Sequence, residues 1–172
     1  MIRKATAKDA AEIARIQVSS WQAAYSGIVP QSHLDSMSIK ERAKRWAQNI
    51  KKPGDKILVA DIAESLEGFI FFGPSCDEDA DGEHEIGAVY IQPQAWRQGI
   101  GKELVKRAEE IMFCRFAADI TLWVFEENHS SRKFYTSVGY SPDGATKEMT
   151  IGGALLNATR YRKVVNETGK PG

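Results

Sequence analysis

A glycine-rich turn between an apolar strand and an amphipathic helix is the segment of this sequence best suited to bind a ligand. It is Val89-Tyr-Ile-Gln-Pro-Gln-Ala-Trp-Arg-Gln-Gly-Ile-Gly-Lys-Glu-Leu104. The first N–H groups of a helix have no intrahelical acceptor and sit at the positive end of the helix dipole, so they attract phosphate groups. Gly99 and Gly101 would let the backbone approach an anion closely. The alternative is a helix start softened by glycine, with no ligand.

Two common nucleotide motifs do not fit this turn. The dinucleotide fingerprint G-x-G-x-x-G needs a third glycine, but Leu104 stands three residues after Gly101. A P-loop needs Ser or Thr after its lysine, but Glu103 follows Lys102. The turn therefore predicts a phosphate-bearing ligand of another class.

Three segments resemble the GNAT N-acetyltransferase superfamily. Trp96–Gly101 is similar to the family's acetyl-CoA loop, Q/R-x-x-G-x-G/A, although Trp96 stands where Gln or Arg is usual. Asn128–Tyr140 is similar to N-x-x-[AS]-x-x-[FL]-Y-x-x-x-G-[FY], and Trp21–Pro30 (W-x-x-A-Y-x-G-I-V-P) to a bacterial branch of small-molecule acetyltransferases. The matching positions of the second motif are Asn128, Ser131, Phe134, Tyr135, Gly139 and Tyr140.

The resemblance spans residues 2–163 and implies acetyl-CoA as the acetyl donor, with no metal. By this resemblance, backbone groups of Val89, Tyr90 and Ile91 pair with pantetheine like an added strand. Asn128 contacts the cofactor arm, with Ser131 nearby, although Asn128 could equally be an ordinary helix N-cap, and the two roles can coexist. Backbone N–H groups hold the pyrophosphate along Arg97, Gln98, Gly99, Ile100, Gly101 and Lys102.

Tyr135 is the expected general acid, because in the family this tyrosine reaches the CoA sulfur. A phenol with a pKa of about 10 stays protonated at neutral pH and can donate to a leaving thiolate. The alternative is a packed aromatic side chain whose hydroxyl is already hydrogen-bonded.

Glu83 and Glu85 are the candidate general bases. They are two residues apart, so an extended chain directs both side chains to one face, beside the expected acetyl site. The neighbouring acids Asp77 to Asp81 should raise their pKa values by like-charge repulsion. We favour Glu85. In the alternative both are solvated acids and the amine loses its proton to water.

Trp21 and Tyr25 are candidate substrate-binding residues. The family uses this region to line the acceptor pocket, and aromatic walls attract an alkylammonium group. The alternative places this aromatic pair, at i and i+4, in the core.

The composition excludes several other classes of protein. Lys+Arg and Asp+Glu both total 23 in 172 residues, so no global positive charge favours nucleic acid or an anionic membrane. No segment predicts a signal peptide or a membrane span. Cys76 and Cys114 suit neither a disulfide framework nor a zinc site, so we expect a cytoplasmic protein.

The charges are unevenly distributed along the chain. Residues 61–94 hold nine acidic and no basic side chains. This segment favours a cationic acceptor, unless it is simply a solvated acidic loop.

Periodicity and capping signals predict an α/β fold. Strands are expected at 2–5, 56–63, 66–72, 85–92, 120–125, 147–151 and 155–163, and helices at 6–25, 40–50, 99–113 and from Asn128 to about 138. We expect one domain, residues 1–165, with a mixed and mostly antiparallel central sheet flanked by helices, as in GNAT proteins, and a C-terminal tail at 166–172.

The predicted function is transfer of an acetyl group from acetyl-CoA to a primary amine of a small, cationic molecule. No nucleophile motif is present, so we expect direct attack in a ternary complex. Alternatives are a peptide N-terminus or protein lysine as acceptor, or a non-catalytic acyl-CoA-binding module on the same fold. A homodimer is possible, with no nucleic-acid or membrane partner.

Overall fold

A seven-stranded sheet in the order β1-β2-β3-β4-β5-β7-β6 organises the computed structural model, which describes residues 1–53, 56–115 and 119–164. All neighbouring strands are antiparallel except β4 and β5, which are parallel. The predicted mixed, mostly antiparallel sheet is confirmed. The strands are β1 Ile2–Lys4, β2 Lys56–Ile62, β3 Ser65–Pro74, β4 His84–Ile91, β5 Ile120–Phe125, β6 Ser141–Ile151 and β7 Ala154–Lys163.

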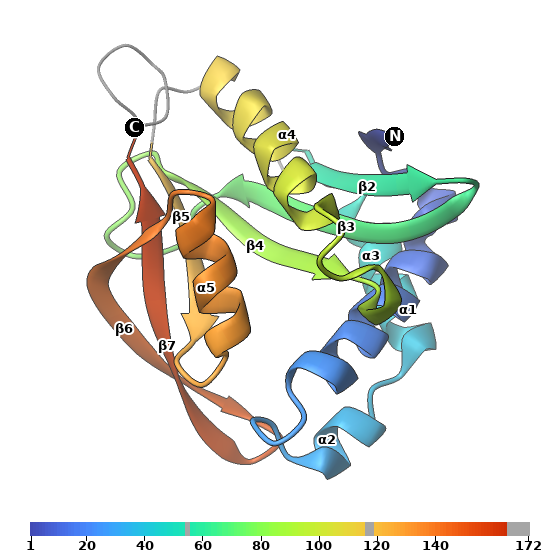
Figure 1. The fold of residues 1–172 in the computed structure, drawn as a ribbon, viewed down its shortest axis with the longest axis horizontal. Coiled ribbons are helices and arrows are strands. Elements are labelled where there is room, and N and C mark those ends of the chain that lie inside the picture. Colours follow the sequence, from blue (N-terminus) through green and yellow to red (C-terminus); the bar gives the residue numbers. More distant parts are fainter. Residues whose placement is uncertain (54–55, 116–118, 165–172) are drawn as a thin grey trace.

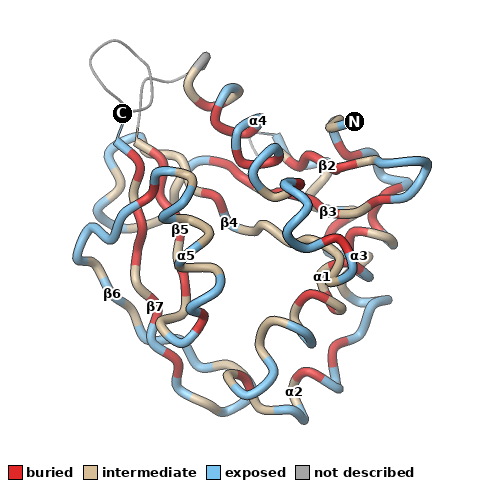
Figure 2. The backbone as a smooth tube through the Cα atoms, in the orientation of Figure 1, coloured by how far each residue is buried: buried red, intermediate tan, exposed pale blue. Residues whose placement is uncertain are grey.

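Helices cover both faces of this sheet (Figure 1). On one face α4 and α5 pack on a core that includes Leu104, Ile70 and Leu122. On the other face α1 and α3 enclose a core that includes Ile13 and Trp46. The helices are α1 Ala10–Ala24, α2 Gln31–Asp35, α3 Ile39–Asn49, α4 Ile100–Arg115 and α5 His129–Ser137. Figure 2 shows buried residues running along the strands between these layers. None of the helices in the described ranges combines the length and apolar character that crossing a bilayer requires.

The sheet divides between β4 and β5. These strands pair only at His84 with Ile120 and at Glu85 with Thr121. Beyond that point, within the described chain, β4 continues beside β3 alone and β5 beside β7 alone. Figure 1 shows the two wings of the sheet diverging from this junction, which we call the fork.

The turn between β6 and β7 closes the far end of the molecule against α2. A Cβ atom on Gly152 would lie 2.6 Å from the Cβ of His33, so only glycine permits this approach. A small core of Val18, Leu34 and Leu156 joins α1, α2 and β7 at this contact. The two wings are therefore connected both at the fork and at this tip.

The structure and the sequence predictions differ most in three places. Helix α2 was not predicted, because five residues carry too little periodicity. Strand β6 begins at Ser141, six residues before the predicted start, because the turn-like segment 142–146 forms an irregularity within the strand. The β2–β3 turn is at Ala63 and Glu64, both with positive φ, so β3 begins at Ser65. The predicted tail at 166–172 lies outside the described residues.

Candidate active site

The open edge of β4 forms one side of the fork. The carbonyl of Ile91 accepts hydrogen bonds from Ser20 Oγ at 2.6 Å and Trp96 Nε1 at 2.8 Å. This carbonyl therefore points away from β3. Successive residues of a strand direct their backbone groups to opposite edges. The N–H and C=O groups of Val89 therefore also point away from β3, whereas those of Tyr90 point toward it. Of the three predicted pantetheine contacts, Val89 offers both backbone groups to the fork and Ile91 only its N–H.

The loop before α4 presents a row of free donors. Gly99 has φ of 85° and Arg97 of 61°, and the first helical bond runs from the Glu103 N–H to the Gly99 carbonyl at 3.1 Å. Within the described residues, no hydrogen bond uses the backbone N–H groups from Arg97 to Lys102. A positive φ suits glycine at position 99. This geometry fits the pyrophosphate site that the resemblance implies.

The close packing of α4 against α5 favours glycine at position 101. A Cβ atom there would lie 3.3 Å from the Phe134 ring, so its absence lets the start of α4 pack against α5. The unusual Trp96 ties the same loop to the end of β4 through its bond to Ile91. The indole thus anchors the loop to the strand, and within the described chain the loop's backbone N–H groups stay free.

Asn128 links α5 to α1. Its Oδ1 accepts a hydrogen bond from the Ser131 N–H at 3.0 Å, which confirms the predicted N-cap. Its side chain also hydrogen-bonds the Tyr25 hydroxyl. The side chain is buried and has protein partners for both functions. A contact between Asn128 or Ser131 and the cofactor stays a prediction.

Tyr135 projects from α5 into a group of aromatic residues. Its ring centroid lies 5.1 Å from that of Phe134 and 6.1 Å from that of Tyr140. Burial raises the pKa of Tyr135 above that of a free phenol, and the proximity of Tyr90 adds to the rise. Tyr135 therefore keeps its proton throughout the physiological range and is able to donate it.

Trp21 and Tyr25 form a wall beside this group, and we call Trp21, Tyr25 and Tyr90 the aromatic wall. The rings of Trp21 and Tyr25 meet edge to face at 4.8 Å, and Trp21 Nε1 donates to the Tyr90 hydroxyl at 2.8 Å. Tyr25 also packs on Phe125 of β5 at 5.6 Å, so it spans from one wing to the other. Sequence reasoning missed the Tyr90 side chain, although strand alternation predicts that it faces α1.

The two candidate bases have opposite environments. Glu85 is in the last paired position of the fork, where burial raises its pKa, the Asp77 carboxylate adds to the rise, and Lys147 opposes it. Glu83 accepts a hydrogen bond from Arg162 Nη1 at 2.7 Å, and this arginine lowers the pKa of Glu83. The prediction of a raised pKa was therefore wrong for Glu83, because an arginine 79 residues away holds it ionised.

Four of the nine acidic side chains of the acidic segment form ion pairs with arginines: Asp61, Asp77, Asp79 and Glu83. Arg160 lies 2.6 Å from Asp79 and 3.3 Å from Asp77, and Asp77 also accepts from Trp123 Nε1. Arg3 pairs with Asp61 at 2.9 Å in the same way. The acidic segment is therefore partly paired within the protein, and a cationic acceptor stays a prediction.

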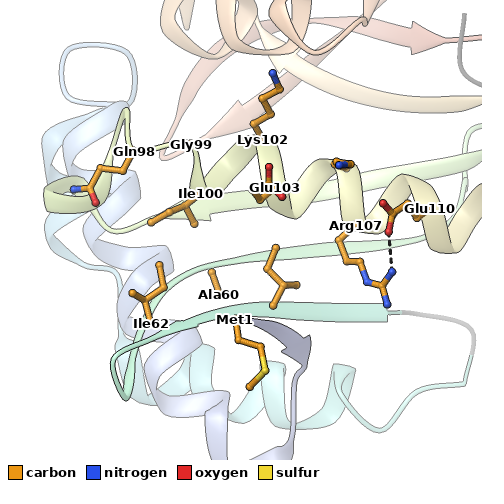
Figure 3. A pocket seen from close by; sticks show the side chains of 12 residues that line it. Met1, Ala60, Ile62, Gln98, Gly99, Ile100, Lys102, Glu103, Arg107 and Glu110 are labelled. Carbon is orange, nitrogen blue, oxygen red and sulfur yellow. Dashed lines mark hydrogen bonds and ion pairs between the residues drawn. The ribbon is translucent and has the colours of Figure 1, made fainter.

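A groove of about 610 Å³ follows the outer side of α4 (Figure 3). It is lined by Met1, Ile2, Ala60, Ile62, Gln98, Gly99, Ile100, Lys102, Glu103, Lys106, Arg107 and Glu110. Its side chains include an ion pair between Arg107 and Glu110 at 2.7 Å, dashed in Figure 3. Neither Tyr135, nor Glu85, nor any member of the aromatic wall lines it. The groove therefore flanks the loop from Arg97 to Lys102, which we call the phosphate loop after its expected ligand. It lies apart from the fork.

Known proteins share this architecture and sequence. The model of the acetyltransferase (GNAT) family matches residues 13–140. The chain is 30% identical over 147 residues to an uncharacterized N-acetyltransferase of Bacillus subtilis strain 168, covering 86% of this chain and 82% of that protein. It is 24% identical over 150 residues to a spermidine N(1)-acetyltransferase of Thermoplasma acidophilum, covering 81% and 86%.

A solved structure has the same fold. It is the PaiA N-acetyltransferase from Thermoplasma acidophilum in complex with coenzyme A, with a TM-score of 0.70 and 22% identity over 92% of this chain and 96% of that one. The family match covers most of the chain, including the phosphate loop, the fork and Tyr135. The chain therefore belongs to the GNAT acetyltransferase family and is an acetyl-CoA-dependent N-acetyltransferase.

Proposed function

We propose that this enzyme acetylates the primary amine of a small molecule, which attacks acetyl-CoA directly in a ternary complex. The observation that carries this proposal is the fork, where β4 has an open edge beyond the half-buried Glu85 and Tyr135 lies near Tyr90 of the same strand. The free edge of Val89 is suited to pantetheine, and the N–H row from Arg97 to Lys102 is suited to its pyrophosphate.

The residues at the fork have the properties that each step of acyl transfer needs. The amine nitrogen attacks the thioester carbon, and Glu85 accepts the proton that the nitrogen loses, directly or through water. The Val89 N–H at the open edge donates to the developing oxyanion. When the tetrahedral intermediate collapses, the C–S bond breaks and Tyr135 gives its proton to the thiolate. The products are the N-acetylated amine and coenzyme A.

Glu85 is better suited than Glu83 to accept this proton. A carboxylate with a raised pKa is a stronger base, and burial at the fork gives Glu85 that property. Glu83 is engaged by Arg162 and also accepts a hydrogen bond from the Asp81 N–H. Protonating Glu83 would break that ion pair.

Replacing Tyr135 with phenylalanine tests the enzymatic proposal. Isothermal titration should show that wild type and Tyr135→Phe bind acetyl-CoA with similar affinity, while NADH does not bind. With a panel of primary amines, thiol release should fall at least ~10-fold in kcat, following typical general-acid contributions. Equal turnover by both proteins would contradict the role given to Tyr135.

Two alternatives would give different results in the same assays. A peptide or lysine acceptor would produce turnover only with peptides or proteins. A non-catalytic module would bind acetyl-CoA and release no thiol with any amine. Spermidine belongs in the panel because a relative carries that activity in its name.

A further inference from the structure

Arg42 has an unusual environment beside the aromatic wall. It lies near the N-terminal end of α3, and its guanidinium carbon is 5.7 Å from the centroid of the Trp21 ring. The Trp21 indole donates a hydrogen bond to the Tyr90 hydroxyl at 2.8 Å. Arg42 is partly buried at this position. Sequence analysis missed it, because the basic residues of this helix resemble an ordinary solvated face.

Arg42 differs from the other arginines that are not exposed. Those others are Arg3, Arg132, Arg160 and Arg162. Each of them donates to at least one carboxylate, carbonyl or hydroxyl oxygen. Across residues 1–53, 56–115 and 119–164, the Arg42 guanidinium donates no hydrogen bond and forms no ion pair. Its one close partner there is the face of Trp21.

A guanidinium in this position favours an external anion. Partial burial removes water from the cation, and the nearby Arg45 adds a like charge, so burial and Arg45 both lower the pKa of Arg42. An arginine nevertheless remains protonated in proteins. The cation–π contact with Trp21 compensates only part of the lost hydration and leaves the five N–H donors unused. A carboxylate or phosphate matches that planar set of donors.

We propose that Arg42 binds an anionic group of the acceptor, so that the substrate is a small primary amine that also carries a carboxylate or a phosphate-like group. This inference rests on the proposed function and specifies its substrate class. Trp21 and Tyr25 then line the space between the bound anion and Tyr135.

The charges at the fork complement such a substrate. Glu85 provides the negative side and attracts the amino group. Arg42, over the Trp21 ring of the aromatic wall, provides the positive side. A zwitterionic acceptor would satisfy both, whereas a polyamine would leave Arg42 facing another cation. This assignment differs from the purely cationic acceptor expected from the acidic segment, in which Asp77, Asp79 and Glu83 have arginine partners.

Matched pairs of acceptors test the proposal. The pairs are L-leucine and L-leucinamide, 4-aminobutyrate and butylamine, and 3-aminopropylphosphonate and propylamine, with spermidine as a polycation. Thiol release with saturating acetyl-CoA gives kcat/KM for each compound. We expect the anionic member of at least one pair to exceed its neutral partner by about 10- to 100-fold, the range of charge-assisted hydrogen bonds. Comparing the pairs that carry a carboxylate with the pair that carries a phosphonate identifies which anionic group the enzyme prefers.

Two variants test whether Arg42 causes the preference for anionic acceptors. Arg42→Gln should reduce the ratio between anionic and neutral members at least ~10-fold, and Arg42→Lys should restore part of it. Lys40→Gln, at an exposed position of α3, is the control and should keep the wild-type ratio. Titration with acetyl-CoA and thermal unfolding should show that each variant is folded.

The results that would overturn this inference differ from those that would overturn the proposed function. Turnover of neutral amines or spermidine in preference to every anionic partner would overturn the role of Arg42 while supporting an amine acetyltransferase. An equal loss for both members of each pair in Arg42→Gln would likewise reduce Arg42 to a structural role. If wild type acetylates peptides and none of these amines, the small-molecule proposal itself fails.

Discussion

The Lys163 ammonium lies 3.0 Å from both carboxylate oxygens of Glu109, inside the protein between β7 and α4. The same ammonium donates to the Val138 carbonyl at 3.0 Å, where α5 ends, and Tyr140 donates to Glu109 at 2.9 Å. This buried group connects α4, β7 and the end of the helix that carries Tyr135. It lies on the α4 face, away from the open edge of β4.

Removing one partner of this ion pair should destabilise the fold strongly. Lys163→Met leaves the Glu109 charge buried without its counter-ion, which typically costs about 3–5 kcal/mol. Urea denaturation followed by tryptophan fluorescence measures the change in the free energy of unfolding. Lys133→Met, an exposed lysine of α5, is the control and should change stability by less than about 0.5 kcal/mol. Equal effects in the two variants would mean that the buried pair contributes little.

Glu85→Gln and Glu83→Gln should separate the two candidate bases. Loss of a general base lowers kcat by about 100-fold or more, so Glu85→Gln should show this fall and lose the acidic limb of the pH–rate profile. Because burial raises the pKa of Glu85, that limb in wild type should lie above the ordinary range for glutamate. Glu83→Gln should retain most of its kcat. The reverse ranking would transfer the role to Glu83.

Gly99→Ala should weaken acetyl-CoA binding. An alanine with φ near 85° is strained by about 1–2 kcal/mol, and relief of that strain would move the N–H donors. Isothermal titration should show a dissociation constant about 10-fold higher. Gly144→Ala is the matched control, because Gly144 also has positive φ and open space around it but lies in β6. It should lose comparable stability with unchanged affinity for acetyl-CoA.

The Arg3–Asp9 pair should make stability depend on acidic pH. Arg3 Nη2 lies 2.9 Å from Asp9, and this arginine, with the Thr6 N–H, lowers the Asp9 pKa to about 2 from its ordinary 3.8. The contribution, about 2 kcal/mol, is present above pH 4 and disappears as the pH falls toward 2, because over this interval the unfolded state binds a proton that the native Asp9 carboxylate does not. The difference in unfolding free energy between wild type and Asp9→Asn should therefore shrink over that interval. A constant difference would contradict this linkage.

The local elements and the phosphate loop were largely predictable. Strand β5 has the predicted limits, Asn128 caps α5, and the donor row precedes α4 as expected from Gly99. These features depend on residues only a few positions apart, through periodicity, side-chain capping and the allowed φ of glycine. Helix α2 and the early start of β6 were missed because their local signals are weak or resemble turns.

The charge environment of the site could not be predicted in the same way. Short segments of the sequence were enough to predict the fold class, the donor row before α4 and the place of Tyr135 on a helix. The contacts of Arg162 with Glu83, of Arg160 with Asp79 and of Arg42 with Trp21 emerged only from the packed fold. An ion pair depends on which side chains the packed strands and helices bring into contact, and this information is absent from the spacing of residues along the chain.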